Sequence, residues 1–245
     1  MYDTNDYINI YNVTNTDFSI KRCEILSEYL EDNNKKPKSI LDLACGTGVF
    51  LDLMQKKFNA KDCVGLDLSK EMYKFAKWSI KNDNINFVLG DMSDFDLKRR
   101  FDLISCNYDA INHLLKFSDW KKMFKKAFKH LENGGVFTFD FNTLYCFNLK
   151  KYHNSTYYSE YENFNHISQC NYKNGVFTFD DTIYVKNKNG TYKMLKEHVD
   201  ETSFEVNKII NALKEIGFSN VKCCDENYKQ TKSKTEKRLY IICEK

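Results

Sequence analysis

Apolar positions in the first 140 residues form short runs, separated by longer stretches with helical periodicity. Between Trp120 and Leu131, for example, apolar residues recur at the three- and four-residue spacing of an amphipathic helix. Alternating strands and helices are typical of an α/β fold, in which helices cover both faces of a parallel sheet. We therefore predict such a sheet, with strands at residues 39–43, 63–66, 85–89, 101–106 and 136–141.

The hydrophobic pattern changes after residue 141. Residues 157–201 are rich in aromatic residues and threonine, and they contain the pairs Asn174-Gly175 and Asn189-Gly190. Asn-Gly pairs between strand-like runs indicate tight hairpin turns, so we predict three antiparallel strands in this segment. Helical periodicity then returns at residues 206–216. Two strand-like runs follow, at residues 220–224 and 238–243.

A single core domain with an insert accounts for this order of elements. At 245 residues, the chain fits one large α/β domain. We predict a core made of residues 1–145 and 203–245, in which residues 1–35 form an N-terminal helical cap whose helix begins near Asp17. Residues 146–202 are then an antiparallel β insert within that core.

Charge, cysteine and histidine patterns argue against several classes of function. With 37 basic and 34 acidic residues, the net charge of +3 gives no reason to expect a nucleic-acid or membrane partner. No apolar run reaches the roughly 18 residues of a membrane span and the N-terminus does not resemble a signal peptide, so we expect a cytoplasmic protein. The nine cysteines form no C-x-x-C pair and the five histidines lack metal-ligand spacing, so we predict no metal site.

A glycine-containing turn follows the first predicted strand. Residues 41–48 read Leu-Asp-Leu-Ala-Cys-Gly-Thr-Gly, and Gly46 and Gly48 let the backbone turn sharply and let a ligand approach the main chain. Asp67 ends the second strand nineteen residues after Gly48, about where nucleotide-binding α/β folds place an acid on ribose hydroxyls. The pattern predicts a small-ligand site where these strands end.

Five segments resemble, in order, the motifs of class I S-adenosylmethionine-dependent methyltransferases. The resemblance implies a Rossmann-like, mostly parallel seven-stranded sheet with helices on both faces and an antiparallel last strand. It also implies an enzyme that uses S-adenosylmethionine and methylates nitrogen or oxygen of a small molecule by in-line displacement. The five segments are residues 41–48, 65–69, 90–92, 101–106 and the His-Leu-x-x-Gly-Gly turn at 130–135.

Three other functions are alternatives to this one. A nicotinamide-dependent dehydrogenase also uses a glycine turn and an acid, but its third glycine would fall at Leu51. Many methyltransferases that act on amino groups of bases carry an N-P-P-Y type motif, where residues 107–110 here read Asn-Tyr-Asp-Ala. The third is a catalytically idle protein that binds S-adenosylmethionine or S-adenosylhomocysteine and acts on a partner through the β insert.

The resemblance implies roles for individual residues in holding the cofactor. The backbone of residues 44–48 would hold the methionine part, with Asp42 either ordering the loop or meeting the amino group through a water molecule. Asp67 would accept the ribose hydroxyls with its two carboxylate oxygens. The full implied set is Tyr11, Phe18, Asp42, Ala44, Cys45, Gly46, Gly48, Asp67, Leu68, Met72, Asp91, Met92 and Cys106.

The adenine end and the fourth strand supply the rest of that set. Leu68 and Met72 would enclose the adenine ring, while Asp91 and the Met92 amide would read its polar edge. Cys106 lies where the family places a residue near the amino acid end of the cofactor. Met72 also has the spacing of a helix-core residue, and Cys106 fits equally well as a plain buried thiol.

The resemblance is closer to a small-molecule subgroup that includes amino sugar N-methyltransferases and glycine N-methyltransferase-like enzymes. There an F/Y-x-x-x-Y segment closes over the cofactor, and Tyr7 and Tyr11 match that spacing, followed by Asp17-Phe18. An amphipathic helix packed on the core is the alternative for this segment. The β insert would serve as a lid over the acceptor or as a dimer surface, so both monomer and homodimer remain open.

Two histidines are candidate general bases, because an amine acceptor must be neutral and a hydroxyl acceptor must lose a proton before it attacks. His113 lies just beyond the fourth strand, where active-site residues of this fold occur, although it can equally cap or pack the next helix. His198 resembles a histidine of small-molecule methyltransferases that have this insert, and Glu201 stands where those enzymes have an arginine.

Overall fold

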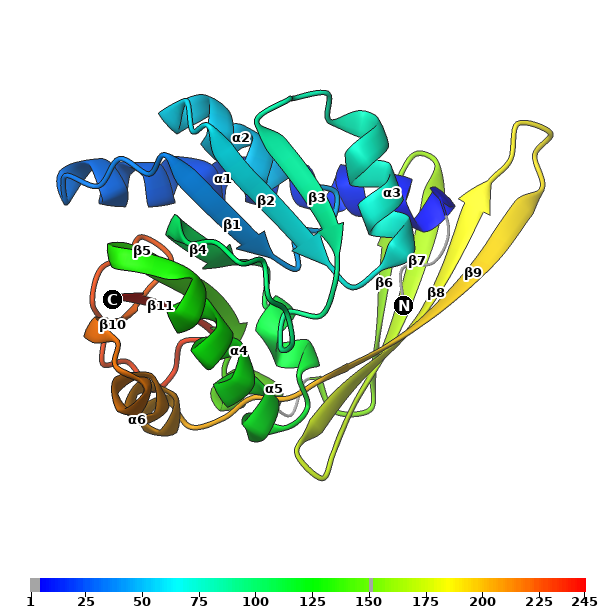
Figure 1. The fold of residues 1–245 in the computed structure, drawn as a ribbon. Coiled ribbons are helices and arrows are strands. Elements are labelled where there is room, and N and C mark those ends of the chain that lie inside the picture. Colours follow the sequence, from blue (N-terminus) through cyan, green and yellow to red (C-terminus); the bar gives the residue numbers. More distant parts are fainter. Residues whose placement is uncertain (1–4, 150–151) are drawn as a thin grey trace.

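The computed structural model describes residues 5–149 and 152–245, and its centre is a seven-stranded sheet (Figure 1). The strands are β1 (Ser39–Leu43), β2 (Asp62–Asp67), β3 (Ile85–Leu89), β4 (Phe101–Cys106), β5 (Leu131–Asn142), β10 (Ser219–Cys224) and β11 (Arg238–Glu244). Their order is β10-β11-β5-β4-β1-β2-β3. The first five strands along the chain are parallel, whereas β11 runs antiparallel to β5 and β10. The predicted Rossmann-like sheet with its antiparallel last strand is confirmed.

Helices cover both faces of this sheet (Figure 1). Side chains alternate between the two faces along a strand, so Leu41 of β1 joins one apolar core and Ile40 joins the other. The first core contains Trp120 and the second contains Leu26, both fully buried. The helices of the first core are α4 (Phe117–His130) and α6 (Val206–Ile216), and those of the second are α1 (Asn5–Asp32), α2 (Val49–Phe58) and α3 (Lys70–Ser79).

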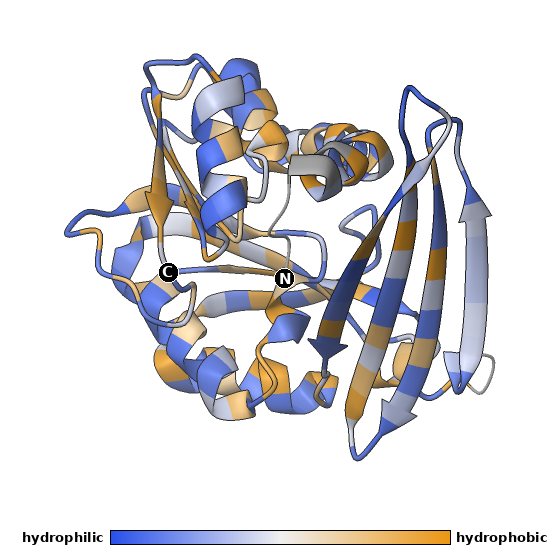
Figure 2. Cartoon of the chain, turned by 90° about the vertical axis from the view of Figure 1, so that its right-hand side faces the viewer, coloured by the Kyte–Doolittle hydropathy of each residue, from blue (hydrophilic) through white to orange (hydrophobic). Residues whose placement is uncertain are grey.

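A second, antiparallel sheet lies beside the first, with polar and apolar residues alternating along its strands (Figure 2). One of its faces packs on the start of α1 through Phe164, Ile183 and Leu195, which contact Tyr7 and Ile10. Short helices accompany it, namely α5 (Leu144–Phe147) and the 3-10 helix η1 (Ala110–His113). The strands are β6 (Ser155–Glu160), β7 (Phe164–Lys173), β8 (Val176–Lys186) and β9 (Tyr192–Glu201).

Two predictions, the number of strands in the insert and the start of the first helix, were wrong. The insert has four strands and not three, because β6 reads Ser-Thr-Tyr-Tyr-Ser-Glu and, as a largely exposed edge strand, shows no apolar alternation. Helix α1 begins at Asn5 and not near Asp17, since the apolar residues of its first turns, Tyr7 and Ile10, pack against the insert. Residues 1–4 of the predicted cap lie outside the described residues.

Strand β5 begins at Leu131, five residues before its predicted start. Leu131 pairs with Phe101 and Val136 pairs with Leu103, so the register shifts between these two pairs. Gly134 lies in the shifted segment with a φ of 76°, a conformation that favours glycine. The Gly-Gly turn expected before the strand is therefore an irregularity inside it.

Candidate functional site

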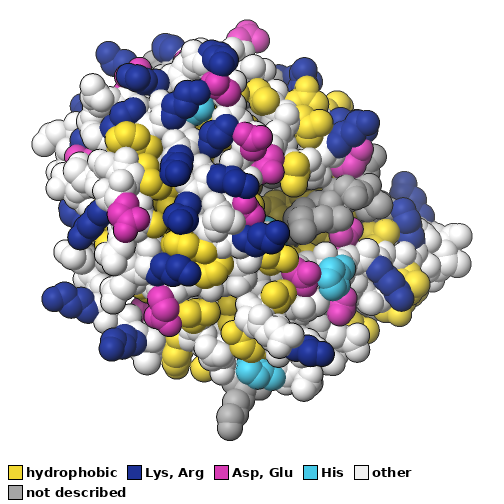
Figure 3. Space-filling model, turned by 60° about the horizontal axis from the view of Figure 1, so that its bottom comes forward, with side chains coloured by type: hydrophobic (Ala, Val, Ile, Leu, Met, Phe, Trp, Pro, Cys, Tyr) yellow, Lys and Arg dark blue, Asp and Glu magenta, His cyan; other side chains and the backbone are white. Residues whose placement is uncertain are grey.

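A cavity of about 520 Å³ lies at the carboxyl ends of β1, β2, β3 and β4. Strand β1 is flanked by β2 on one side and β4 on the other, and open α/β sheets bind ligands where the strand order reverses in this way. Figure 3 views the molecule from the side toward which these strands point, and shows hydrophobic side chains in hollows between scattered basic and acidic ones. Predicted residues that line the cavity are Tyr11, Ala44, Gly46, Asp67, Leu68, Met72, Asp91, Met92 and His113.

Hydrogen bonds to Asp67 link the glycine-containing turn to the start of α3. Its Oδ2 accepts a hydrogen bond of 2.7 Å from the Gly46 amide, and its Oδ1 accepts one of 2.8 Å from the Ser69 amide. Burial raises the pKa of Asp67, while these amides act in the opposite direction. Each carboxylate oxygen keeps a further lone pair, so the same side chain can accept ribose hydroxyls from the cavity.

Gly48 has a packing role and does not line the cavity. It precedes α2 with a φ of 79°, and a Cβ atom placed on it would lie 2.7 Å from the Phe87 ring and 2.8 Å from Ile80. The first glycine, Gly46, has a φ of 55° and does line the cavity. The two glycines of the motif therefore have different roles. Gly46 borders the cavity, and Gly48 allows close packing between α2 and β3.

Asp42 lies in the interior beside the cavity. It is 3% exposed, and Ser105 Oγ donates a hydrogen bond of 2.7 Å to its Oδ1. Burial raises its pKa to about 7, against the opposing effect of the Ser105 and Asn107 hydrogen bonds. Asp42 lines a smaller hollow of about 30 Å³, together with the predicted residues Phe18 and Cys45.

The small hollow adjoins the large cavity because both are lined by Tyr11, Ala44, Asn107 and Tyr108. A ligand that fills the cavity can therefore extend a small polar end into the hollow. This arrangement matches the shape of S-adenosylmethionine, which has a large nucleoside and a short amino acid end.

Comparison with known proteins supports the assignment that the geometry suggests. The sequence family described as "Methyltransferase domain" matches residues 40–135. A crystal structure of an S-adenosylmethionine-dependent methyltransferase from Clostridium acetobutylicum ATCC 824 is 25% identical and has a TM-score of 0.86, over 98% of both chains. The chain contains a methyltransferase domain and has the fold of the class I S-adenosylmethionine-dependent methyltransferases.

Curated relatives of the enzyme include two described activities. Malonyl-[acyl-carrier protein] O-methyltransferase 1 of Ilyobacter polytropus is 24% identical over 216 residues, which span 87% of this chain and 75% of the relative. A dTDP-3-amino-3,4,6-trideoxy-alpha-D-glucopyranose N,N-dimethyltransferase of Streptomyces venezuelae is 28% identical over 140 residues, or 56% of each chain.

The two candidate bases lie in different places in the enzyme. His113 lines the cavity, and its Nδ1 lies 3.4 Å from the carbonyl oxygen of Asp200 in β9. His198 lines neither the cavity nor the hollow, is exposed, and has its Nδ1 2.7 Å from Asp180 Oδ1. The hydrogen bond to Asp180 raises the pKa of His198. The structure thus brings only His113 to the ligand space.

Cys106 is fully buried and lines neither space. Its Sγ lies 3.9 Å from the sulfur of Met92, which does line the cavity. Burial raises the pKa of this thiol well above its usual value. Cys106 therefore contacts Met92 on the side away from the cavity. Met72 fits both of its predicted roles, because it is buried in the core side of its helix and also lines the cavity.

Sequence reasoning did not single out Arg22, a buried arginine in the wall of the hollow. Arg22 is 2% exposed, and its Nη1 donates a hydrogen bond of 2.6 Å to the carbonyl of Glu226. Its Nε and Nη2 have no hydrogen-bond partner in the described part of the chain. The available signal was its position four residues after Phe18 and four before Leu26, on the apolar side of the predicted helix.

Beside the cavity, Glu201 and Arg238 belong to a buried polar cluster. Arg238 donates to Asp140 at 2.7 Å and to Asp109 at 2.9 Å. Asn142 donates to Glu201 at 3.1 Å and also to Asp109. Burial and the nearby Asp109 raise the pKa of Glu201 to about 8. The cluster joins the ends of β5, β9 and β11 under the loop that carries His113.

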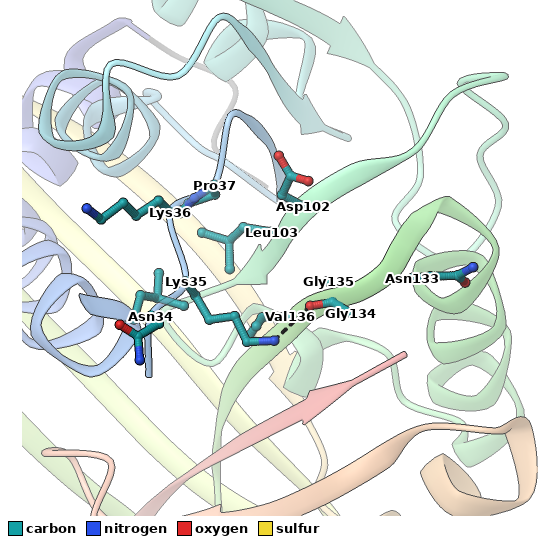
Figure 4. A pocket seen from close by; sticks show the side chains of 11 residues that line it. Asn34, Lys35, Lys36, Pro37, Asp102, Leu103, Asn133, Gly134, Gly135 and Val136 are labelled. Atoms are coloured by element: carbon teal, nitrogen blue, oxygen red, sulfur yellow. Dashed lines mark hydrogen bonds between the residues drawn. The ribbon is translucent and has the colours of Figure 1, made fainter. Parts of the chain in front are cut away.

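Another cavity, of about 150 Å³, lies at the opposite ends of β1 and β4 (Figure 4). Lys35 crosses it to donate a hydrogen bond of 2.9 Å to the Gly134 carbonyl. Asp102 in its wall accepts hydrogen bonds from the Lys38 and Ser39 amides. None of the predicted site residues lines it.

The described residues contain neither a metal-binding cluster nor a membrane-spanning helix. No group of three or more metal-ligating side chains is present within residues 5–149 and 152–245. Among the helices of the described ranges, none is both long enough and apolar enough to cross a membrane.

Proposed function

We propose that the enzyme transfers a methyl group from S-adenosylmethionine to nitrogen or oxygen of a small molecule by in-line displacement. The observation that carries this proposal is a single ligand space lined by both the Gly46 and Asp67 end and the His113 end. When bound, S-adenosylmethionine supplies the electrophilic methyl group. The relatives' described activities, an N,N-dimethyltransferase and an O-methyltransferase, include both kinds of acceptor atom.

The residues at the glycine turn bind and orient the cofactor in this proposal. Asp67 holds the ribose hydroxyls, Leu68 and Met72 enclose the adenine, and Asp91 and Met92 lie at its polar edge, all of them lining the cavity. Asp67 also fixes Gly46 and Ser69 through their amides, so the ribose site and the turn keep one geometry. Fixed geometry matters because in-line displacement gains most from positioning the acceptor against the methyl group.

His113 receives the proton that the acceptor loses. If its Nδ1 carries the hydrogen that faces the Asp200 carbonyl, Nε2 is left with the lone pair that a base needs. The loop around His113 is held in place by Asn112, whose side chain donates to the Thr202 carbonyl at 2.7 Å and to that of Asn142 at 3.0 Å. His113 therefore acts from a fixed position.

The β insert, residues 146–202, acts as the lid over the acceptor. Its last strand reaches the His113 loop through Asn112 and Thr202, and its inner face packs on Tyr7 and Ile10 of α1. Tyr11 of α1 and His113 line the cavity, so the insert contacts two segments of the cavity wall from outside, and in this proposal it closes over the acceptor. A homodimer formed through the insert is the alternative, and light scattering of the purified chain separates the two states.

The activity is tested by incubating the full chain with S-adenosylmethionine and a panel of small amines and alcohols. We expect formation of S-adenosylhomocysteine that depends on one class of acceptor, detected by mass spectrometry. Tight cofactor binding without turnover on any acceptor, together with capture of a partner through the insert, would favour a non-catalytic binding module.

The cofactor site is tested separately with Asp67→Ala, which we expect to abolish S-adenosylhomocysteine binding in calorimetry. Asp62→Ala is the matched control, because Asp62 starts the same strand but is half-exposed and paired with Arg99. Circular dichroism checks that both variants keep the fold. Unchanged affinity in Asp67→Ala would contradict the assignment of the cavity.

A further inference from the structure

Two consecutive residues after β4 have a backbone conformation that is uncommon outside glycine. Tyr108 has a φ of 61° and Asp109 has a φ of 48°. A positive φ costs energy in any residue that carries a Cβ, and a bulky residue such as tyrosine rarely adopts it. Such residues persist only where the surrounding structure holds them, and they cluster at ligand sites. The turn formed by Tyr108 and Asp109 therefore depends on a part of the fold that stabilises it.

The carboxylate of Asp140 provides that stabilisation. Asp140 is fully buried in β5, where its Oδ1 accepts a hydrogen bond of 2.7 Å from the Tyr108 amide. Its Oδ2 accepts one of 2.9 Å from the Asp109 amide. Hydrogen bonds to a charged acceptor are roughly twice as strong as those between neutral groups. One side chain thus holds both residues of the strained turn.

Arg238 balances the charge of Asp140 inside the protein. Its Nη1 donates to Asp140 at 2.7 Å, and its Nη2 donates to Asp109 at 2.9 Å. A buried carboxylate without a cationic partner is costly, so Asp140 depends on this ion pair. Arg238 therefore contacts the turn twice, directly through Asp109 and indirectly through Asp140.

The strained turn places the Tyr108 side chain where the cavity meets the hollow, because Tyr108 lines both spaces. Its ring meets the Phe18 ring edge-on, with 4.6 Å between the ring centres, and the Tyr11 ring at 6.2 Å. The sulfur of S-adenosylmethionine joins the adenosine part to the amino acid part. A molecule of it that occupied both spaces would have its sulfur, and the methyl group on it, at this junction.

We propose that Asp140 and Arg238 are positioning residues for methyl transfer, which act by holding the Tyr108 ring at the junction so that it orders the methyl donor. Neither Asp140 nor Arg238 lines the cavity or the hollow, so their effect on the ligand is indirect. Tyr108 is the residue that contacts the ligand. This proposal rests on the proposed function, because it requires that the two spaces hold S-adenosylmethionine.

A double-mutant cycle with Tyr108→Ala and Asp140→Asn tests the proposal on the full chain. Tyr108→Ala removes the ring, and Asp140→Asn leaves one acceptor oxygen for two amides. An aromatic contact corresponds to about a 3- to 10-fold change in affinity, so each variant should lower the affinity for S-adenosylhomocysteine in calorimetry by about that factor. The double variant should lose no more than either single variant, within about twofold, because no ring is left to position.

Losses that multiply in the double variant would overturn the proposal, because residues that act independently contribute additive free energies. Unchanged affinity in Asp140→Asn would also overturn it. Asp102→Asn is the matched control. The Asp102 carboxylate likewise accepts hydrogen bonds from two backbone amides, those of Lys38 and Ser39, but at the opposite end of the sheet. It should lower the stability to urea and leave the affinity unchanged.

Arg238→Lys forms a second cycle with Tyr108→Ala, which decides the question if Asp140→Asn does not fold. Lysine keeps the positive charge but lacks the planar fork that contacts two carboxylates. We expect the same 3- to 10-fold loss and the same absence of a further loss in the double variant. Absence of S-adenosylhomocysteine binding to the wild type would overturn the proposed function as well, whereas wild-type binding with multiplying losses would overturn the positioning role alone.

Discussion

Replacing Gly48 by alanine should destabilise the enzyme through packing and not through loss of a ligand contact. Gly48 has a φ of 79°, and its added Cβ would lie 2.7 Å from the Phe87 ring and 2.8 Å from Ile80. A left-handed conformation costs a non-glycine residue roughly 1–2 kcal/mol. Overpacking a dense core costs about 1–3 kcal/mol more. Gly48→Ala should therefore lower the free energy of unfolding by roughly 2–5 kcal/mol.

Gly134→Ala is the matched control in the same sheet. Gly134 also has a positive φ, of 76°, but a Cβ there would meet nothing within 4 Å. Only the conformational cost of about 1–2 kcal/mol then applies. Urea unfolding measures the two free energies directly. In thermal unfolding, 1 kcal/mol lowers Tm by roughly 2–4 °C at this chain length, so the two variants should be clearly separated.

The binding of S-adenosylhomocysteine to folded Gly48→Ala completes the experiment. Calorimetry well below the unfolding transition should give an affinity near that of the wild type, because Gly48 does not line the cavity. Equal destabilisation of the two glycine variants would refute the packing argument. Loss of binding in a fully folded Gly48→Ala would show that Gly48 belongs to the cofactor site after all.

Further predictions concern pH and the two histidines. Affinity for S-adenosylhomocysteine should rise with pH up to about 7. The reason is that Asp42, whose pKa is raised to about 7, must lose its proton before it can accept a hydrogen bond from the ligand's ammonium group. Calorimetry should show this rise in the wild type and no rise in Asp42→Asn. Glu201, with a pKa near 8, holds its proton longer in the folded than in the unfolded chain, so stability should fall as pH rises from about 4.5 to 8. Glu201→Gln should flatten that fall in urea titrations, and an unchanged slope would contradict the burial argument. His113→Gln should lower kcat about 100-fold or more and His198→Gln by less than twofold, and equal losses in steady-state kinetics would refute the assignment of the base.

Local sequence patterns predicted the sheet well. Strands β1 and β4 are buried and parallel, so they appear in the sequence as short, mostly apolar runs that can be recognised without knowledge of their neighbours. Elements stabilised by contact with a distant segment were missed or misplaced. Strand β6 is a polar edge strand, and the first turns of α1 pack against the insert, which lies more than 140 residues later in the chain.

In the candidate site, too, features set by local sequence were predicted and features set by distant contacts were not. Gly46 and Asp67 were predictable because a turn that admits a ligand needs glycine and an acid at the end of an apolar strand needs a partner. The hydrogen bond between them joins β1 to β2, and it follows from the sheet rather than from either motif. The same spacing rule could not tell that Gly48 packs against Phe87.

The sequence by itself determined the fold of a class I methyltransferase core, together with the glycine-containing turn and the strand-ending acid at which we propose that the cofactor binds. Those features depend on spacing within about thirty residues, which periodicity and turn chemistry record. The tertiary structure decided which distant side chains line the cavity and the hollow, placing Arg22 of α1 and Asp42 of β1 in the wall of one hollow and leaving His198 outside while His113 lines the cavity. Such contacts arise from the packing of α1 and the β insert onto the sheet, and no local pattern encodes which side chain then faces inward.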